Sequence, residues 1–253
     1  MSSGADSRAG ELLRQATQAE SSGARAKYAT RGLAEVGGDR TLRALLLRQL
    51  YLSQMESEEF EAARQTASEA LALGLLSDVA CQDLARAQLA LGHYREAVEE
   101  LRRASRVGPA SRRAFHLWTL GSTLYFGQEY AAAATALERA VRWGTTARPL
   151  YRAQLLLVRL SQGRKIAPSR LATSLAQARQ ELEGAACGQG YGRYVLGELA
   201  HRQGDMPAAR RYLEEFIQRS DDGRVAQRVA LSAELTRARH LLSTLEVEES
   251  AKV

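Results

Sequence analysis

A short pattern recurs along this chain at nearly fixed intervals: an aromatic or large apolar residue, two variable residues and then alanine. It reads Phe60-Glu-Ala-Ala63, Tyr94-Arg-Glu-Ala97, Tyr130-Ala-Ala-Ala133 and Met206-Pro-Ala-Ala209. The first two intervals are 34 and 36 residues, and the last, of 76 residues, is close to two periods. Repetition at this period is typical of stacked helical units, each of which buries its apolar face against its neighbours. The pattern therefore predicts a repeat protein and directs attention to binding surfaces.

The composition favours helices. The 253 residues are 45% hydrophobic and 25% charged, which is ordinary for a folded protein, and only four are proline. Alanine, leucine and arginine dominate and asparagine is absent, which argues against a hairpin-rich all-β fold. The clearest predicted helix hairpin covers residues 78–107: Gly92 breaks the first helix, Tyr94 opens the second, and Pro109 follows its end.

These residues resemble the tetratricopeptide repeat, a 34-residue helix-turn-helix with a Leu-Gly pair in its first helix and a Gly-Asp-Tyr turn before its second. The Leu-Gly pair is present at Leu120-Gly121 and Leu196-Gly197, and the turn at Gly204-Asp205-Met206. The resemblance implies an all-α fold, a right-handed superhelical solenoid of antiparallel helix pairs with about six pairs and a C-terminal capping helix. It also implies a non-enzymatic protein that binds other proteins.

We expect a single solenoid over residues 1–253, with atypical ends because terminal repeats must be solvated on one side. The expected divisions are a divergent N-terminal helix pair at 1–37, repeats over 42–220 that are degenerate at 149–184, a capping helix at 224–247 and a disordered tail at 248–253. In the degenerate repeat, the usual turn is replaced by the segment 163–169.

In such a solenoid the first helix of each pair lines a concave groove, with side chains spaced three and four residues apart. The register of the Leu-Gly pairs predicts these groove positions: Arg48, Leu52, Gln82, Arg86, Phe115, Trp118, Ser122, Tyr125, Tyr151 and Tyr194. Aromatic residues and arginine are the side chains that most often anchor a partner, so this groove is the predicted partner-binding site. Packing between neighbouring pairs is the alternative role for Phe115 and Tyr151.

The chain carries no recognisable catalytic or cofactor motif. Its four histidines lack metal-ligand spacing, its two cysteines form no CxxC pair, and no nucleophile elbow is present. The glycine-rich stretch 188–192 follows no predicted strand and is read as the entry to a repeat. We therefore expect no enzyme activity, catalytic residue, metal, cofactor or small-molecule substrate.

The leading functional hypothesis is a cytoplasmic adaptor or scaffold that holds a peptide segment or domain of another protein in its groove, in a bacterial signalling, motility or secretion assembly. The absence of a long apolar run argues against membrane insertion, and three lysines among 35 basic residues suggest a GC-rich bacterial genome. Self-association is a secondary hypothesis. The net charge of +6 leaves open a nucleic-acid-associated regulatory module, which is disfavoured because basic and acidic residues are interleaved.

Overall fold

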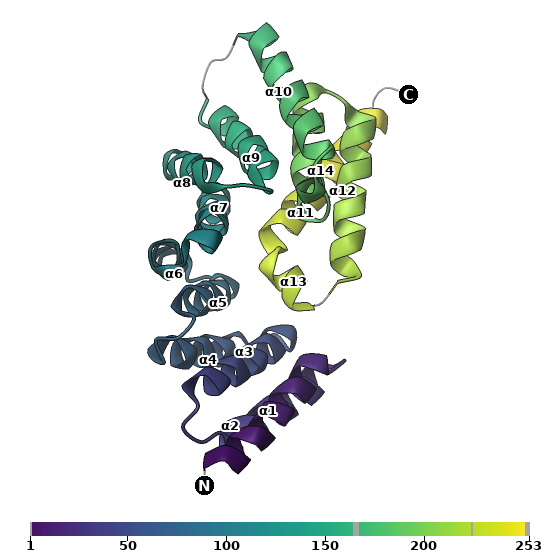
Figure 1. The fold of residues 1–253 in the computed structure, drawn as a ribbon. Helices are drawn as coiled ribbons and strands as arrows, with labels where there is room; N and C mark the ends of the chain where they lie inside the picture. Colours follow the sequence, from purple (N-terminus) through teal and green to yellow (C-terminus); the bar gives the residue numbers. More distant parts are fainter. Residues whose placement is uncertain (1, 164–166, 224, 251–253) are drawn as a thin grey trace. The chain divides into compact units, whose positions relative to one another are not determined.

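The computed structural model describes residues 2–163, 167–223 and 225–250, and within them every regular element is a helix. The chain divides into two compact units, which are described separately: unit 1 is Met1–Pro109 with Val225–Ala230, and unit 2 is Ala110–Arg224 with Leu231–Val253. Unit 1 contains α1 (Ser2–Gln18), α2 (Ser22–Glu35), α3 (Arg40–Glu56), α4 (Phe60–Ala72), α5 (Ser77–Ala90), α6 (Tyr94–Val107) and α13 (Val225–Ala230) (Figure 1). Unit 2 contains α7 (Ala110–Phe126), α8 (Tyr130–Trp143), α9 (Arg148–Ser161), α10 (Pro168–Glu183), the 3-10 turn η1 (Ala186–Gly188), α11 (Tyr191–Gln203), α12 (Met206–Asp221) and α14 (Ser232–Ser250).

The helices form consecutive pairs, as the repeat predicted. The large residue of each sequence pattern is the first residue of the second helix in its pair: Phe60 of α4, Tyr94 of α6, Tyr130 of α8 and Met206 of α12. The alanine three residues later is fully buried in all four pairs. Small residues bring the paired helices close together, since a Cβ atom on Gly121 would lie 2.6 Å from the Leu137 side chain, and one on Gly197 would lie 2.6 Å from that of Leu213. The all-α repeat fold with six pairs is thus confirmed for the described residues.

The turn inside four of the pairs has the same backbone conformation. The residue two positions before the second helix has a positive φ in each: 59° at Glu58, 80° at Gly92, 62° at Gln128 and 78° at Gly204. Glycine adopts this left-handed conformation without the Cβ clash that other residues suffer. Glu58 and Gln128 therefore carry local strain that the other two turns avoid.

Replacing Gln128 by glycine should raise the free energy of unfolding of unit 2 by about 0.5–1 kcal/mol, because the relief of strain exceeds the entropic cost of glycine at such a site. Gln128 is exposed, so little side-chain contact is lost. The measurement is urea unfolding followed by tryptophan fluorescence, since both tryptophans, Trp118 and Trp143, lie in unit 2. The control is the reverse substitution, Gly204→Ala, at the equivalent turn position, which should lower the free energy of unfolding of unit 2. An increase with Gly204→Ala would contradict this account of the turns.

The expected capping helix at 224–247 is two helices, because the chain turns between Ala230 and Ser232. The first of them, α13, packs on α3 and α5 of unit 1, and α14 packs along α12 of unit 2. Residues 248–250 of the predicted disordered tail belong to α14, and 251–253 lie outside the described residues. In the degenerate repeat α9 and α10 form the predicted pair, with Leu175 and Leu182 buried, while residues 164–166 of its loop lie outside the described part.

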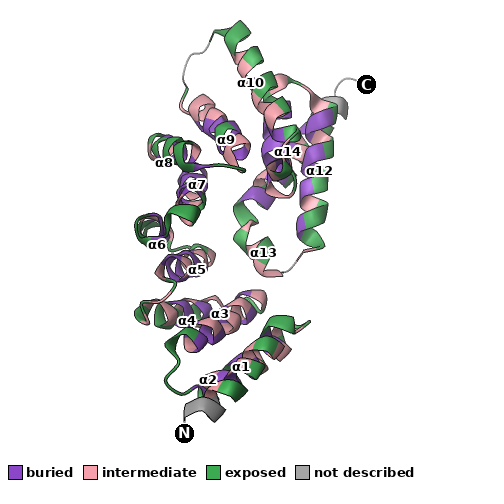
Figure 2. Cartoon of the chain, in the orientation of Figure 1, coloured by how far each residue is buried: buried purple, intermediate pink, exposed green. Residues whose placement is uncertain are grey.

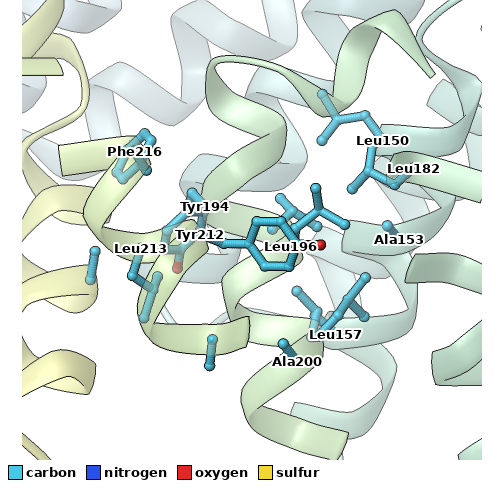
Figure 3. Close-up of a cluster of buried hydrophobic side chains, with 14 of the residues drawn as sticks. Leu150, Ala153, Leu157, Leu182, Tyr194, Leu196, Ala200, Tyr212, Leu213 and Phe216 are labelled. Atoms are coloured by element: carbon cyan, nitrogen blue, oxygen red, sulfur yellow. The ribbon is translucent and has the colours of Figure 1, made fainter. Parts of the chain in front are cut away.

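Buried residues follow the faces along which neighbouring helices meet, and exposed residues cover the opposite faces (Figure 2). In unit 2 one core joins helices α7 through α12 and α14, and Figure 3 shows the part of it formed by α9, α10, α11 and α12. There Tyr194, Tyr212 and Phe216 lie among leucines such as Leu157 and Leu196, and all five are almost fully buried. Three large aromatic side chains in this core indicate that the unit uses aromatic residues internally.

Candidate partner-binding surfaces

The candidate surface of unit 1 is the side formed by α3 and α5, the first helices of their pairs, which we call the α3/α5 face. Arg48 and Leu52 lie one turn apart on α3, and Arg86 and Ala90 lie one turn apart on α5. Each helix therefore presents an arginine followed, one turn later, by an apolar residue. Arg48 is exposed, and Leu52 and Arg86 are partly exposed, so three predicted site residues are accessible here.

A buried carboxylate holds the two arginines together. The Nε of Arg48 is 3.3 Å from one carboxylate oxygen of Asp83, and the Nη1 of Arg86 is 3.7 Å from the other. Burial raises the pKa of Asp83, and both arginines oppose that shift. Asp83 also raises the pKa of the Tyr51 hydroxyl, although burial is the main cause. One negative charge thus faces two guanidinium groups, and the face keeps an excess positive charge.

Gln82, the other predicted site residue of unit 1, is 5% exposed. It precedes Asp83 on α5 in a run of buried residues from Ala80 to Ala85. Helix α5 packs against both α4 and α6, which leaves Gln82 buried although Arg86 of the same helix is partly exposed. The prediction that Gln82 faces a partner is therefore corrected: it is an interior residue.

In unit 2 the predicted groove aromatics contact one another. The ring of Trp118 on α7 lies 6.0 Å from that of Tyr151 on α9 and 4.9 Å from that of Tyr191 on α11. The Tyr194 ring then lies 5.7 Å from Tyr191 and 5.4 Å from Phe216. Aromatic pairs at these separations attract each other beyond their simple burial. The first helices of three successive pairs are joined by their own aromatic side chains.

A buried amide links the same three helices. Gln154 on α9 accepts a hydrogen bond from Trp118 Nε1 at 2.5 Å, and its own amide donates to Ser122 Oγ at 2.9 Å and to the Tyr191 hydroxyl at 3.3 Å. Gln154 is 1% exposed. Its amide group thus has partners on both neighbouring helices, which a buried amide needs in order to avoid a desolvation penalty.

Helix α14 contacts the side chains of the same group of helices. Arg237 pairs with Glu198 of α11 through two guanidinium nitrogens, and its guanidinium carbon lies 5.8 Å from the centre of the Tyr125 ring on α7. Glu234, one turn earlier, is buried and hydrogen-bonds to Tyr191. Burial raises the pKa of Glu234 to about 7. The C-terminal helix therefore covers side chains that the repeat register had placed in an open groove.

Four predicted site residues of unit 2 are corrected for this reason. Ser122, Tyr125, Tyr151 and Tyr194 are each at most 6% exposed, because the aromatic contacts and α14 enclose them. A partner cannot reach them in this arrangement. Trp118 is partly exposed, and Phe115 is 38% exposed, so these two remain accessible in unit 2.

The glycine-rich stretch is a close-packed chain crossing, in agreement with its reading as a repeat entry. It joins η1 to the start of α11. A Cβ atom on Gly188 would lie 2.0 Å from the Leu182 carbonyl oxygen, and one on Gly192 would lie 2.2 Å from the Cys187 carbonyl oxygen. These glycines are required by backbone proximity.

Sequence reasoning missed the roles of Glu234 and Arg237, which it placed on the expected capping helix at 224–247 without any contact assigned to them. Both share a face of α14 with Leu241, at intervals of three and four residues. That spacing shows that the two charged residues and Leu241 lie on the same face of the helix, but it does not show which helix this face contacts. Asp83 lies in a helical run with Leu84 next to it and Cys81 two residues before it, and an acid among such residues is the signal that sequence reasoning could have used.

The paired helices, the shared turn and the buried alanines show a helical-repeat fold of the tetratricopeptide type. The same fold is found in the C-terminal part of a tetratricopeptide-repeat-containing protein from Cytophaga hutchinsonii, with a TM-score of 0.55 and 12% identity over 98% of this chain and 90% of that one. It is also found in the apo form of RapI (TM-score 0.53, 14% identity, 88% and 84% covered) and in PilF of Pseudomonas aeruginosa (0.51, 21%, 83% and 91%). No protein-family model and no curated protein sequence matches this chain.

No helix in the described part of the chain is long and apolar enough to cross a membrane. In the same part of the chain, no group of three or more histidine, cysteine, aspartate or glutamate side chains could hold a metal ion.

Proposed function

We propose that this protein is a non-enzymatic adaptor that binds a segment of another protein on the α3/α5 face of unit 1. The observation that carries the proposal is the pair of arginines, Arg48 and Arg86, which share one buried carboxylate and lie beside the partly exposed Leu52. Arginine next to apolar surface is a frequent anchor of protein interfaces. The excess positive charge favours a partner segment that carries a carboxylate.

The accessible side chains Phe115 and Trp118 of unit 2 are proposed as a second contact surface. Both are aromatic and their rings lie 5.6 Å apart, so together they offer a rigid apolar surface. The buried residues Ser122, Tyr125, Tyr151 and Tyr194 then act by holding the helices under this pair in place.

A protein partner is favoured over nucleic acid because many of the arginines are paired with acids. Examples on second helices are Arg64 with Glu61 at 2.6 Å and Arg102 with Glu99 at 2.5 Å. Such pairing breaks up the continuous basic surface that phosphate binding needs. Both cysteines are free, which supports placement in a reducing compartment such as a bacterial cytoplasm.

The test compares Arg86→Gln with Arg64→Gln in affinity capture from extracts of the source cells, with cross-linking and mass spectrometry. The two arginines are matched: each side chain is 35% exposed and each pairs with an acid three residues earlier. We expect Arg86→Gln to lower recovery of a specific protein about fivefold, the ratio that corresponds to ~1 kcal/mol, while Arg64→Gln leaves it unchanged. Equal recovery with both variants, or recovery of nucleic acid alone, would overturn the proposal.

A further inference from the structure

The α3/α5 face is partly occupied by a segment of the same chain. Helix α13 packs on α3 and α5, and its Ala226 and Val229 join a cluster that also contains Leu52 and Ala90. The buried members of this cluster include Tyr51 and Met55. Gln227 and Arg228, on the other side of α13, are exposed. The segment therefore meets unit 1 as a short amphipathic helix, with small apolar side chains three residues apart.

Helix α13 is short and only partly covered where it packs on unit 1. None of the six residues of α13 is buried, and its apolar side chains are only partly covered. A helix of six residues is too short to be stable alone in water, so its helicity depends on the surface that receives it. The hydrophobic gain from three partly covered side chains of alanine and valine size is a few kcal/mol at most.

The charged part of the face remains uncovered beside it. Leu52 and Ala90 meet the docked segment, whereas Arg48 and Arg86, one turn earlier on the same helices, retain 45% and 35% side-chain exposure. The apolar half of the α3/α5 face is thus filled by the chain itself and the basic half is open.

We propose that the apolar half of the α3/α5 face is a docking site for a short amphipathic helix with alanine- or valine-sized residues at positions i and i+3, and that Val225–Ala230 is its built-in occupant. A partner helix with this residue pattern binds the site by displacing α13. This inference extends the proposed function. It depends on the proposed function only in taking the natural ligand to be a segment of a partner protein. While α13 is docked, the apparent affinity for a competing helix falls by the fraction of molecules in which the site is free.

The test uses a defined probe: a fluorescent 16-residue peptide that carries Val225–Ala230 between alanine–lysine helical turns. Its binding to the full-length chain is followed by anisotropy at protein concentrations up to about 1 mM, the range of effective concentration for a tethered segment. The variant A226E/V229E removes the built-in occupant and leaves the receiving surface intact. We expect it to bind the probe at least tenfold more tightly than the wild type does.

Two controls establish the site. Adding Leu52→Glu to the released variant should abolish binding, and a probe with glutamate at the same two apolar positions should not bind. Circular dichroism confirms that each variant is folded, and Ala90→Glu replaces Leu52→Glu if the latter is not. Equal binding to wild type and released variant, or no binding to either, overturns the inference. Neither result would test the adaptor proposal, because the peptide probe does not involve the natural partner. That proposal is tested by the Arg86→Gln experiment.

Discussion

Replacing Arg237 by methionine should lower the free energy of unfolding of unit 2 by about 2–4 kcal/mol, because it leaves a buried carboxylate without its cation. Glu198 is 1% exposed, and in addition to Arg237 it accepts a hydrogen bond from the Tyr194 hydroxyl at 3.3 Å. The Arg237 side chain is 37% exposed, so solvent reduces the effect below that of a fully buried pair. Urea unfolding followed by tryptophan fluorescence measures the change in unit 2.

The matched control for this prediction is Arg239→Met on the same helix. Arg239 pairs with Asp221 at 3.2 Å, but these two side chains are 54% and 44% exposed. A pair at the surface contributes about 0–1 kcal/mol. The double variant E198Q/R237M should recover part of the loss, since no charge is then left buried. If the two arginine variants destabilise unit 2 equally, Arg237 does not hold α14 on the tyrosines of α7 and α11.

Gly192→Ala should destabilise unit 2 by about 2–3 kcal/mol, because the new methyl group would clash with main chain. Its Cβ would lie 2.2 Å from the Cys187 carbonyl oxygen and 3.0 Å from the carbon of that carbonyl. A flexible side chain could move aside, but here η1 must shift relative to the start of α11. The same fluorescence-detected unfolding gives the free energy.

Gly184→Ala is the neighbouring control, since its Cβ would meet only the Gln180 carbonyl oxygen, at an ordinary 3.5 Å. We expect a change of less than about 1 kcal/mol there, because alanine is tolerated at a helix end with negative φ. A Gly192→Ala variant as stable as Gly184→Ala would mean that the η1–α11 crossing adapts easily.

The repeat pattern predicted the helices well because its positions answer local and pairwise requirements. A small residue lets two paired helices approach closely, and the structure places Ala133 of α8 and Gly121 of α7 at such a contact. The turns were also predictable, since the left-handed residue at Gly92 or Gly204 stands at the same distance from the next helix. The alanine and the turn recur in four of the six pairs and are therefore visible as periodicity.

The candidate site was only partly predictable. The register identified Arg48, Leu52 and Arg86 on accessible first helices, but it placed Tyr151 and Tyr194 on an open groove that the structure closes. Register gives the direction of a side chain relative to its own helix. It does not say whether a later segment of the chain will cover that side.

The sequence alone determined the helix pairs, their turns and the small residues at their contacts, because each depends on residues close together in the chain or repeated at a fixed interval. Only the tertiary structure decided which surfaces stay open. Two segments that carry no repeat signal, α13 and α14, pack on the α3/α5 face of unit 1 and on the aromatic side chains of unit 2. Their placement depends on contacts such as that of Arg237 with Glu198, 39 residues apart, which no local pattern encodes.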